Sequence, residues 1–143
     1  MTDVSTLDDF PFQTFDKIRY GDTDRQGHVN NAVFTTYLET GRCEVLYNPD
    51  NGLLLDATSF VIARVDVHFV AEINWPGRVE IGTGISKVGN SSIGLHQAVF
   101  QDGTCVCRAD SVIVQMNDAT RKSQPLSDVA IRFFETHYMT DSA

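Results

Sequence analysis

The chain has 143 residues and a mass of 15.9 kDa, the size of one ordinary domain with a single hydrophobic core. Hydrophobic residues make up 42% of it, and no stretch approaches the roughly 18 consecutive apolar residues of a membrane-spanning helix. Nineteen acidic and eleven basic side chains give a net charge of −8, which opposes contact with nucleic acid phosphates. Composition therefore excludes a membrane-spanning protein, and we expect no nucleic acid and no membrane among its partners.

The two ends of the chain are more polar than its middle. Residues 1–12 carry three aspartates among small polar residues, and residues 139–143 read MTDSA. We therefore expect a loose N-terminal segment over 1–12, a single domain over 13–138 and a C-terminal tail over 139–143. The first residues hold neither a basic region nor an apolar run, so they do not look like a secretory signal, and a cytoplasmic location is expected.

The cysteines also favour a reducing compartment. Cys43, Cys105 and Cys107 form neither a CxxC pair nor a cluster with histidine at zinc-binding spacing. Cys105 and Cys107 are two residues apart in an expected strand, so they should share one face without forming an easy disulfide. We interpret all three as free thiols, and we expect no metal ion and no cofactor.

Hydrophobic periodicity predicts a strand, a loop and a helix in the first third of the chain. A strand is expected over Gln13–Tyr20, followed by a polar loop that contains Gly21 and Gly27. Apolar residues then recur at three- and four-residue spacing over Asn31–Tyr47, which is typical of an amphipathic helix. Gly41 falls within it, where glycine costs about 1 kcal/mol relative to alanine, so we expect another segment to approach closely there.

The rest of the chain alternates apolar and polar residues with the period of strands. In Phe60–Val70 the odd positions are apolar and are expected to form one buried face. These positions are Val61, Ala63, Val65, Val67 and Phe69. Three further alternating segments begin at Arg78, near Ile93 and near Val106, joined by short turns that suit hairpins. These four strands are predicted to form a meander, and a last helix is expected from near Pro125.

This order of elements predicts an α+β fold. An antiparallel sheet of five strands has one face to cover, and the helix over Asn31–Tyr47 is the only long one expected within the chain. We therefore expect a five-stranded antiparallel sheet wrapped around a long central helix.

The loop before the helix concentrates residues that could carry chemistry, and it reads GDTDRQGHVNN. An EF-hand calcium loop would need a glutamate at its twelfth place, which is Val33, and a helix before it, so this interpretation fails. Helix capping and turn formation explain Asp22 or Asn30 taken singly. An acyl-transfer site is the remaining interpretation of the whole set.

Such a site would use both the loop and the helix. The first turn of a helix has unpaired amide groups and a partial positive charge, so it polarises a carbonyl oxygen and stabilises a developing oxyanion. Asp24 lies just before that end. Its carboxylate could attack the polarised carbonyl or activate a water molecule, which are the two routes by which a carboxylate hydrolyses an ester-like bond.

Loop and helix together resemble the 4-hydroxybenzoyl-CoA thioesterase family of hotdog-fold acyl-CoA thioesterases. The shared pattern is Asp22-x-Asp24-x-x-Gly27-His28-Val29-Asn30-Asn31, continued by Tyr37-Leu38-Glu39 and Arg42, and the resemblance covers roughly residues 13 to 117. It implies a hotdog fold and hydrolysis of an acyl-CoA thioester. It also implies that Asp24 is the catalytic base or nucleophile and that the Asn31 backbone amide polarises the thioester carbonyl. The resemblance further implies a homodimer or homotetramer with the active site at a dimer interface.

The remaining loop residues and the coenzyme A contacts complete the expected site. Four residues are expected to shape the loop: Asp22, Gly27, His28 and Asn30. Lys87, with Ser91 and Ser92, falls in the stretch where the family binds coenzyme A and is the expected substrate contact. Glu39 lies about 12 Å along the helix from its start, too far to serve the same carbonyl, and an ion pair with Arg42 is expected instead.

Two other functions stay open on this sequence. A non-catalytic hotdog module that binds an acyl thioester would present the same loop. A hotdog hydratase or dehydratase uses an aspartate and a histidine ahead of an Asn-Pro turn, and the spacing from Asp24 to His28 without Asn-Pro does not match that arrangement. Phe34, Tyr37 and Phe60 are candidates for an acyl pocket, although aromatic residues at such spacing are more often plain core.

Overall fold

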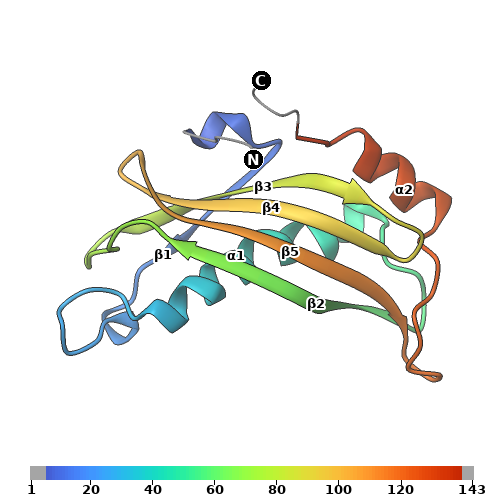
Figure 1. The fold of residues 1–143 in the computed structure, drawn as a ribbon, viewed down its shortest axis with the longest axis horizontal. Coiled ribbons are helices and arrows are strands. Elements are labelled where there is room, and N and C mark those ends of the chain that lie inside the picture. Colours follow the sequence, from blue (N-terminus) through green and yellow to red (C-terminus); the bar gives the residue numbers. More distant parts are fainter. Residues whose placement is uncertain (1–5, 140–143) are drawn as a thin grey trace.

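A computed structural model describes residues 6–139 of the chain. Within them, five antiparallel strands form one sheet in the order β1-β3-β4-β5-β2, and the sheet curves around helix α1 (Figure 1). The strands are β1 (Phe12–Lys17), β2 (Thr58–Phe69), β3 (Arg78–Val88), β4 (Ser92–Gln101) and β5 (Thr104–Asn117). The helices are α1 (Asn31–Leu46) and α2 (Asp128–Glu135), with short 3₁₀ turns η1 (Leu7–Asp9), η2 (Tyr20–Asp22) and η3 (Pro49–Asn51). The predicted α+β class, with a five-stranded antiparallel sheet around a central helix, is confirmed.

Helix α1 begins at its capping residue and buries one face. The Asn30 side chain accepts a hydrogen bond from the Ala32 amide at 2.9 Å, which caps the first turn. The buried residues recur at three- and four-residue spacing: Phe34, Tyr37, Leu38, Gly41, Val45 and Leu46. Leu46 is the last helical residue and Tyr47 caps the end, so the predicted helix is confirmed.

Gly41 is a point of close approach between α1 and the sheet. A Cβ atom built on Gly41 would lie 2.5 Å from Cγ2 of Ile81, 3.0 Å from Nε2 of Gln97 and 3.1 Å from Oγ1 of Thr83. The Gln97 side chain also donates to the Leu38 carbonyl oxygen at 3.0 Å, which holds the helix on β4. The close approach expected at this position is confirmed.

Gly41→Ala should lower the stability of the fold although alanine is the better helix former. The gain in helix propensity is about 1 kcal/mol, whereas overpacking a buried contact typically costs about 1–3 kcal/mol and here meets three neighbours. Urea unfolding and thermal melting measure the net change. Gly21→Ala is the matched control, because a Cβ there meets no atom within 4 Å. A Gly41→Ala protein at least as stable as the wild type contradicts the prediction.

The strand order differs from the predicted meander. β3, β4 and β5 follow one another as hairpins, but β2 pairs with β5 and not with β3. The chain leaves β2 alongside β5, where the Val70 and Ala71 amides both donate to the Val106 carbonyl oxygen. It then crosses to the β1 side of the sheet, where the Ile18 amide donates to the Gly77 carbonyl oxygen at 3.0 Å. The meander is therefore wrong for β2, because this long-range crossing decides its neighbour.

A β-bulge in β2 changes which side chains face α1. The pairing with β5 passes from Ile62 directly to Arg64, which leaves Ala63 as an extra residue. Val61 and Val65 therefore lie on opposite faces of the sheet, although both are odd-numbered. Val65 is also 44% exposed. The predicted single buried face of odd residues is wrong, because the bulge interrupts the alternation and Val65 and Phe69, beyond it, stay exposed.

A second bulge, in β5, separates two of the cysteines. The pairing with β4 passes from Cys107 to Cys105 and leaves Val106 as the extra residue. Cys107 packs in the cluster that includes α1, whereas Cys105 packs beside Phe10 and Phe100 on the other face. The expectation that Cys105 and Cys107 share a face is therefore wrong, although all three cysteines are free.

The N-terminal segment is held more closely than predicted. Residues 1–5 lie outside the described part of the chain, but residues 6–12 contain η1 and the start of β1. Phe10 is 3% exposed and fills the space above Gly82, where a Cβ atom would collide with its ring. The expectation of a loose segment over 1–12 is therefore wrong for its second half.

The C-terminal part packs against β3. α2 begins after the Ser127 cap and buries Ala130 and Phe134. The Met139 amide then donates to the Ile85 carbonyl oxygen at 2.8 Å, and residues 140–143 of the expected tail lie outside the described residues. Over residues 6–139, neither α-helix combines the length and the apolar character that crossing a membrane requires.

Candidate active site

The loop between β1 and α1 closes as a tight turn. Thr23 and Val29 form an isolated antiparallel bridge, and the Asp24 amide donates to the His28 carbonyl oxygen at 3.0 Å. The Gly27 amide donates to the Asp24 carbonyl oxygen at 3.1 Å, and Gly27 has a φ of 89°, a conformation that favours glycine. Asp24 is thereby held at the first position of the turn, and Gly27 and His28 contribute main-chain contacts.

The Asp24 carboxylate keeps most of its hydrogen-bonding capacity. Its Oδ1 accepts one hydrogen bond, from the Gln26 amide at 2.9 Å, and the residue is partly exposed. No second donor reaches this carboxylate among residues 6–139. An ionised carboxylate has about four acceptor positions, so Asp24 has room to hold a water molecule or to approach a substrate.

The N-terminus of α1 presents an unpaired amide beside this loop. The Asn30 amide donates to the Asp22 carbonyl oxygen at 2.9 Å, and the Ala32 amide donates to the Asn30 side chain. The Asn31 amide lies between them and has no acceptor in the described part of the chain. With the partial positive charge of the helix end, this amide is suited to bind an oxygen that carries negative charge.

A cavity of about 210 Å³ adjoins this helix end. Its lining includes His28 and Asn31 from the loop and helix start, Phe34 from α1, and Phe69 and Glu72 from the end of β2 and beyond. The Phe34 and Phe69 rings meet edge to face with centroids 5.2 Å apart, so the walls are largely apolar. Asp24 does not line this cavity in the single chain, and it lies on the turn that leads into it.

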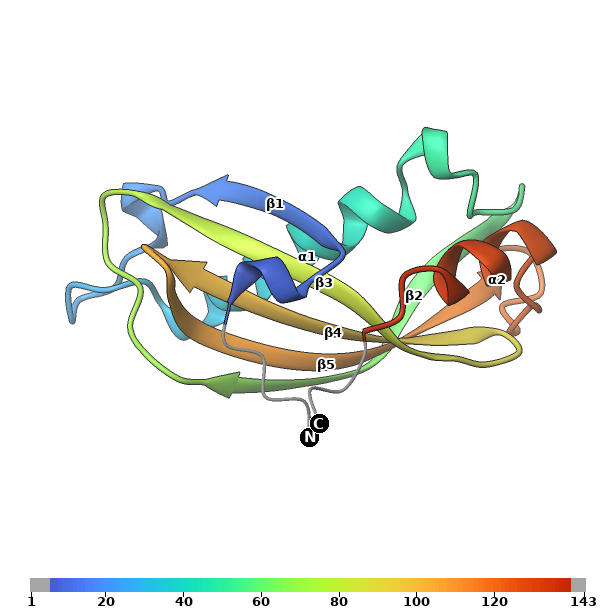
Figure 2. The ribbon, with the colours of Figure 1, turned by 90° about the horizontal axis from the view of Figure 1, so that it is seen from above.

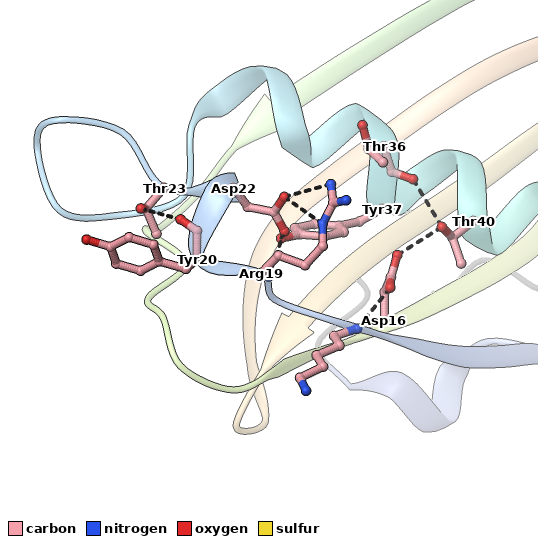
Figure 3. Close-up of polar contacts among 9 residues, drawn as sticks. Asp16, Arg19, Tyr20, Asp22, Thr23, Thr36, Tyr37 and Thr40 are labelled. Atoms are coloured by element: carbon pink, nitrogen blue, oxygen red, sulfur yellow. Dashed lines mark hydrogen bonds and ion pairs between the residues drawn. The ribbon is translucent and has the colours of Figure 1, made fainter.

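Asp22 is buried and fully bonded, unlike Asp24. Its carboxylate accepts hydrogen bonds from the Arg19 amide at 2.9 Å, from the Arg19 guanidinium at 3.0 and 3.2 Å and from the Tyr37 hydroxyl at 2.9 Å (Figure 3). Burial opposes ionisation of Asp22, but the hydrogen bonds from Arg19 and Tyr37 and the Arg19 charge outweigh it, so the pKa of Asp22 is lowered. Asp22 is therefore a charged anchor at neutral pH and has no free position for a catalytic water.

The residues expected to bind coenzyme A lie at the other end of the same chain. Lys87 is in β3, Ser91 is in the β3–β4 turn and Ser92 begins β4. The hydrophobic cluster at this end contains Leu46, the last residue of α1. A helix of 16 residues spans about 24 Å, and the β3–β4 turn and the loop before Asn31 lie at opposite ends of the molecule (Figure 2). One chain alone therefore does not bring these three residues to the loop.

Lys87 lines a second hollow, on the face of the sheet opposite α1. This hollow has a volume of about 310 Å³ and contains Arg64 from β2 as its other cation. Asp66 and Asp110 also line it, so its charges are balanced within one chain.

An ion pair and three aromatic residues, all but one of them on α1, are further expectations from the sequence. Arg42 and Glu39 form the expected ion pair, with nitrogen and oxygen 4.0 Å apart. Of the three aromatic candidates for an acyl pocket, Phe34 lines the cavity beside Asn31. Tyr37 is buried with its hydroxyl directed to the loop, and Phe60 packs in the cluster at the far end of α1.

No local sequence signal marked the part of the site that the β2–β3 connection supplies. Phe69, Val70, Ala71 and Glu72 reach the cavity because the chain crosses the end of the sheet there. The Val29 amide donates to the Ile73 carbonyl oxygen at 2.8 Å and ties this connection to the loop. Within residues 6–139, no group of three or more histidine, cysteine, aspartate or glutamate side chains is arranged to hold a metal ion.

A sheet that wraps a central helix, with a carboxylate-bearing loop at the N-terminus of that helix, defines a hotdog-fold protein of the thioesterase type. Residues 18–134 match the family model of the thioesterase-like superfamily, and the chain belongs to that superfamily.

Individual relatives of known function or structure are similar to this chain over most of their length. The chain is 24% identical over 123 residues to the acyl-CoA thioester hydrolase YbgC of Escherichia coli O157:H7, which covers 83% of this chain and 92% of that protein. The structure of a predicted thioesterase from Bacillus stearothermophilus has a TM-score of 0.80 and 30% identity, covering 89% of this chain and 96% of that one. A thioesterase from Thermus thermophilus, complexed with coenzyme A and zinc, has a TM-score of 0.77 and 26% identity, covering 89% and 94%.

Proposed function

We propose that the protein hydrolyses an acyl-CoA thioester to the free acid and coenzyme A. The oxygen of water becomes bonded to the acyl carbon, the carbon–sulfur bond breaks, and the sulfur leaves as a thiolate that takes up a proton. The Asn31 amide polarises the thioester carbonyl and stabilises its oxyanion. Asp24 acts either as the general base that activates the water or as the nucleophile that attacks first.

The observation that carries this proposal is that Asn31, whose amide is unpaired in the described part of the chain, lines a cavity with largely apolar walls. The helix end supplies the polarising group, and the cavity offers an apolar surface to an acyl chain or ring. Asp24 lies on the adjoining turn with most of its acceptor positions free. Membership of the thioesterase-like superfamily supports the same chemistry, and coenzyme A is bound to one of the similar structures.

We also propose that the protein forms a homodimer along β2. This strand of 12 residues pairs on one side only within the described chain, so its outer edge is open. Ile62 and Val65 are each 44% exposed and Phe69 is 51% exposed on this strand. Long open edges that carry apolar side chains favour pairing with another chain. A second copy, paired antiparallel along the same edge, would cover these side chains.

The same pairing would complete the coenzyme A site. The β3–β4 turn lies level with the start of β2, since Ser92 pairs with Val114 and Val114 pairs with Val61. A two-fold axis through two antiparallel β2 strands brings the start of β2 in one copy beside the end of β2 in the other. The β3–β4 turn of the second copy, with Ser91 and Ser92, would then approach the α1 N-terminus of the first, and Lys87 would lie at the same end on the opposite face of the sheet. This arrangement explains how residues at opposite ends of one chain could share a substrate.

A panel of short, long and aromatic acyl-CoAs tests hydrolysis directly. We expect release of one free thiol and one free acid per molecule for at least one member, measured with a chromogenic thiol reagent and by mass spectrometry. Tight binding without thiol release on any member contradicts hydrolysis and favours the non-catalytic binding module. Addition of water to an enoyl-CoA with the thioester left intact favours a hydratase instead.

A further inference from the structure

Tyr37 carries a hydroxyl that core packing alone does not require. The side chain is 1% exposed in the middle of α1, and its hydroxyl donates to Oδ2 of Asp22 at 2.9 Å, across 15 residues of sequence (Figure 3). Phenylalanine would fill the same space without a buried polar group to satisfy. The hydroxyl therefore serves its acceptor, Asp22.

Asp22 in turn joins the two ends of the loop between β1 and α1. Its carboxylate accepts from the amide of Arg19, which directly precedes η2, and its main-chain oxygen accepts from the Asn30 amide at 2.9 Å. Asn30 directly precedes the Asn31 amide, and Asp24 follows Asp22 by two residues. The two groups of the proposed reaction, the Asp24 carboxylate and the Asn31 amide, are thus both connected to Asp22, which accepts the hydrogen bond from Tyr37.

The protonation states suit a permanent hydrogen bond. Burial, followed by the hydrogen bond to Asp22, raises the pKa of the Tyr37 hydroxyl, so it keeps its proton at neutral pH. Asp22 is ionised there, and a hydrogen bond to a charged acceptor is stronger than one between neutral groups.

A separate contact holds β1 on the helix. The Thr40 hydroxyl donates to Oδ2 of Asp16 at 3.0 Å, one helical turn beyond Tyr37 (Figure 3). Removing the Tyr37 hydroxyl therefore leaves β1 anchored to α1 and removes the hydrogen bond from α1 to the Asp22 carboxylate, which keeps its hydrogen bonds from Arg19.

We infer that Tyr37 is a positioning residue for the hydrolytic reaction. Through Asp22, its hydroxyl sets the placement of the Asp24 carboxylate relative to the Asn31 amide. This inference rests on the proposed function. Catalytic groups displaced by about 1 Å can lose up to 10²-fold in rate, so the hydroxyl should affect turnover more than it affects the fold.

The test compares Tyr37→Phe with Tyr47→Phe. Tyr47 caps the other end of α1, and its hydroxyl donates to the Phe60 carbonyl oxygen at 2.9 Å and accepts from the Phe60 amide at 3.2 Å, so this variant removes one hydroxyl and two hydrogen bonds. We expect Tyr47→Phe to lower the melting temperature at least as much as Tyr37→Phe does. Only Tyr37→Phe should lower kcat, by about tenfold or more, with KM for the same acyl-CoA changed less than about twofold.

Amide hydrogen exchange supplies a readout of position that is independent of activity. The Asn30 amide, bonded to the Asp22 carbonyl oxygen, should exchange faster in Tyr37→Phe and at the wild-type rate in Tyr47→Phe. The inference is overturned if Tyr37→Phe keeps the wild-type kcat, if Tyr47→Phe loses as much, or if Asn30 exchange is unchanged. Wild-type enzyme that hydrolyses no acyl-CoA overturns the proposed function itself, which is a different result from normal turnover by Tyr37→Phe.

Discussion

Asp24→Asn should lower kcat by about 10²–10⁴-fold and change KM little, the loss typical of removing a general base. An asparagine side chain keeps an oxygen that can accept from the Gln26 amide, so the turn should persist. It can neither take a proton from water nor attack a carbonyl carbon. Steady-state kinetics with free-thiol detection on the best substrate of the acyl-CoA panel measures the loss.

Asp118→Asn is the matched control for this substitution. The Asp118 carboxylate is exposed and accepts one side-chain hydrogen bond, from the Ser59 hydroxyl at 2.6 Å, far from the loop along the chain. Its kcat should stay within about twofold of wild type. Near-full thioester hydrolysis by Asp24→Asn would falsify the assignment of Asp24 and would turn attention to Glu72, the carboxylate that lines the cavity.

Val65→Asp should convert a dimer into monomers and reduce acyl-CoA hydrolysis by about 10²-fold or more, because the second half of the site is then lost. The side chain is 44% exposed in one chain, so a carboxylate there is compatible with the fold. In an apolar interface between two β2 edges, the same carboxylate would be buried without a partner. The cost is several kcal/mol, about as much free energy as a small interface supplies, so the dimer should dissociate. Light scattering coupled to gel filtration and steady-state kinetics measure both effects on one sample.

Val129→Asp provides the comparison for the interface. Val129 is 58% exposed on α2, away from the β2 edge, so the substitution places the same charge at an apolar position that is at least as exposed as Val65. Its oligomeric state and kcat should match those of the wild type. A Val65→Asp protein that remains dimeric, or a monomer with full activity, would show that the β2 edge does not complete the site.

Several local features could be read from the sequence because each depends on neighbours within a few residues. The spacing of Phe34, Tyr37, Leu38 and Val45 predicted α1, and the polar run before it predicted the loop. Gly41 indicated a close approach, which Ile81 and Gln97 supply. The motif from Asp22 to Asn31 indicated thioesterase chemistry, and the match of residues 18–134 to the thioesterase-like superfamily agrees with it.

Features that depend on residues distant in sequence were predicted poorly. The alternation of β2 was recognised, but its position beside β5 and its bulge at Ala63 were not. Cys105 and Cys107 lie on different faces for the same kind of reason, a bulge where β5 pairs with β4. The substrate role expected for Lys87 requires it near Asp24, whereas within one chain the β3–β4 turn lies at the far end of α1.

The family, the central helix and the loop that carries Asp24 all follow from the amino-acid sequence, since periodicity, capping and motif spacing are local properties of the chain. Which residues surround that loop depends on the tertiary structure. The crossing from β2 to β3 places Phe69 and Glu72 in the lining of the cavity that Asn31 also lines, and the Tyr37 hydroxyl reaches Asp22 across 15 residues. Such contacts form when the sheet closes around the helix, because strand order and β-bulges follow from burial of the whole core and from no single segment.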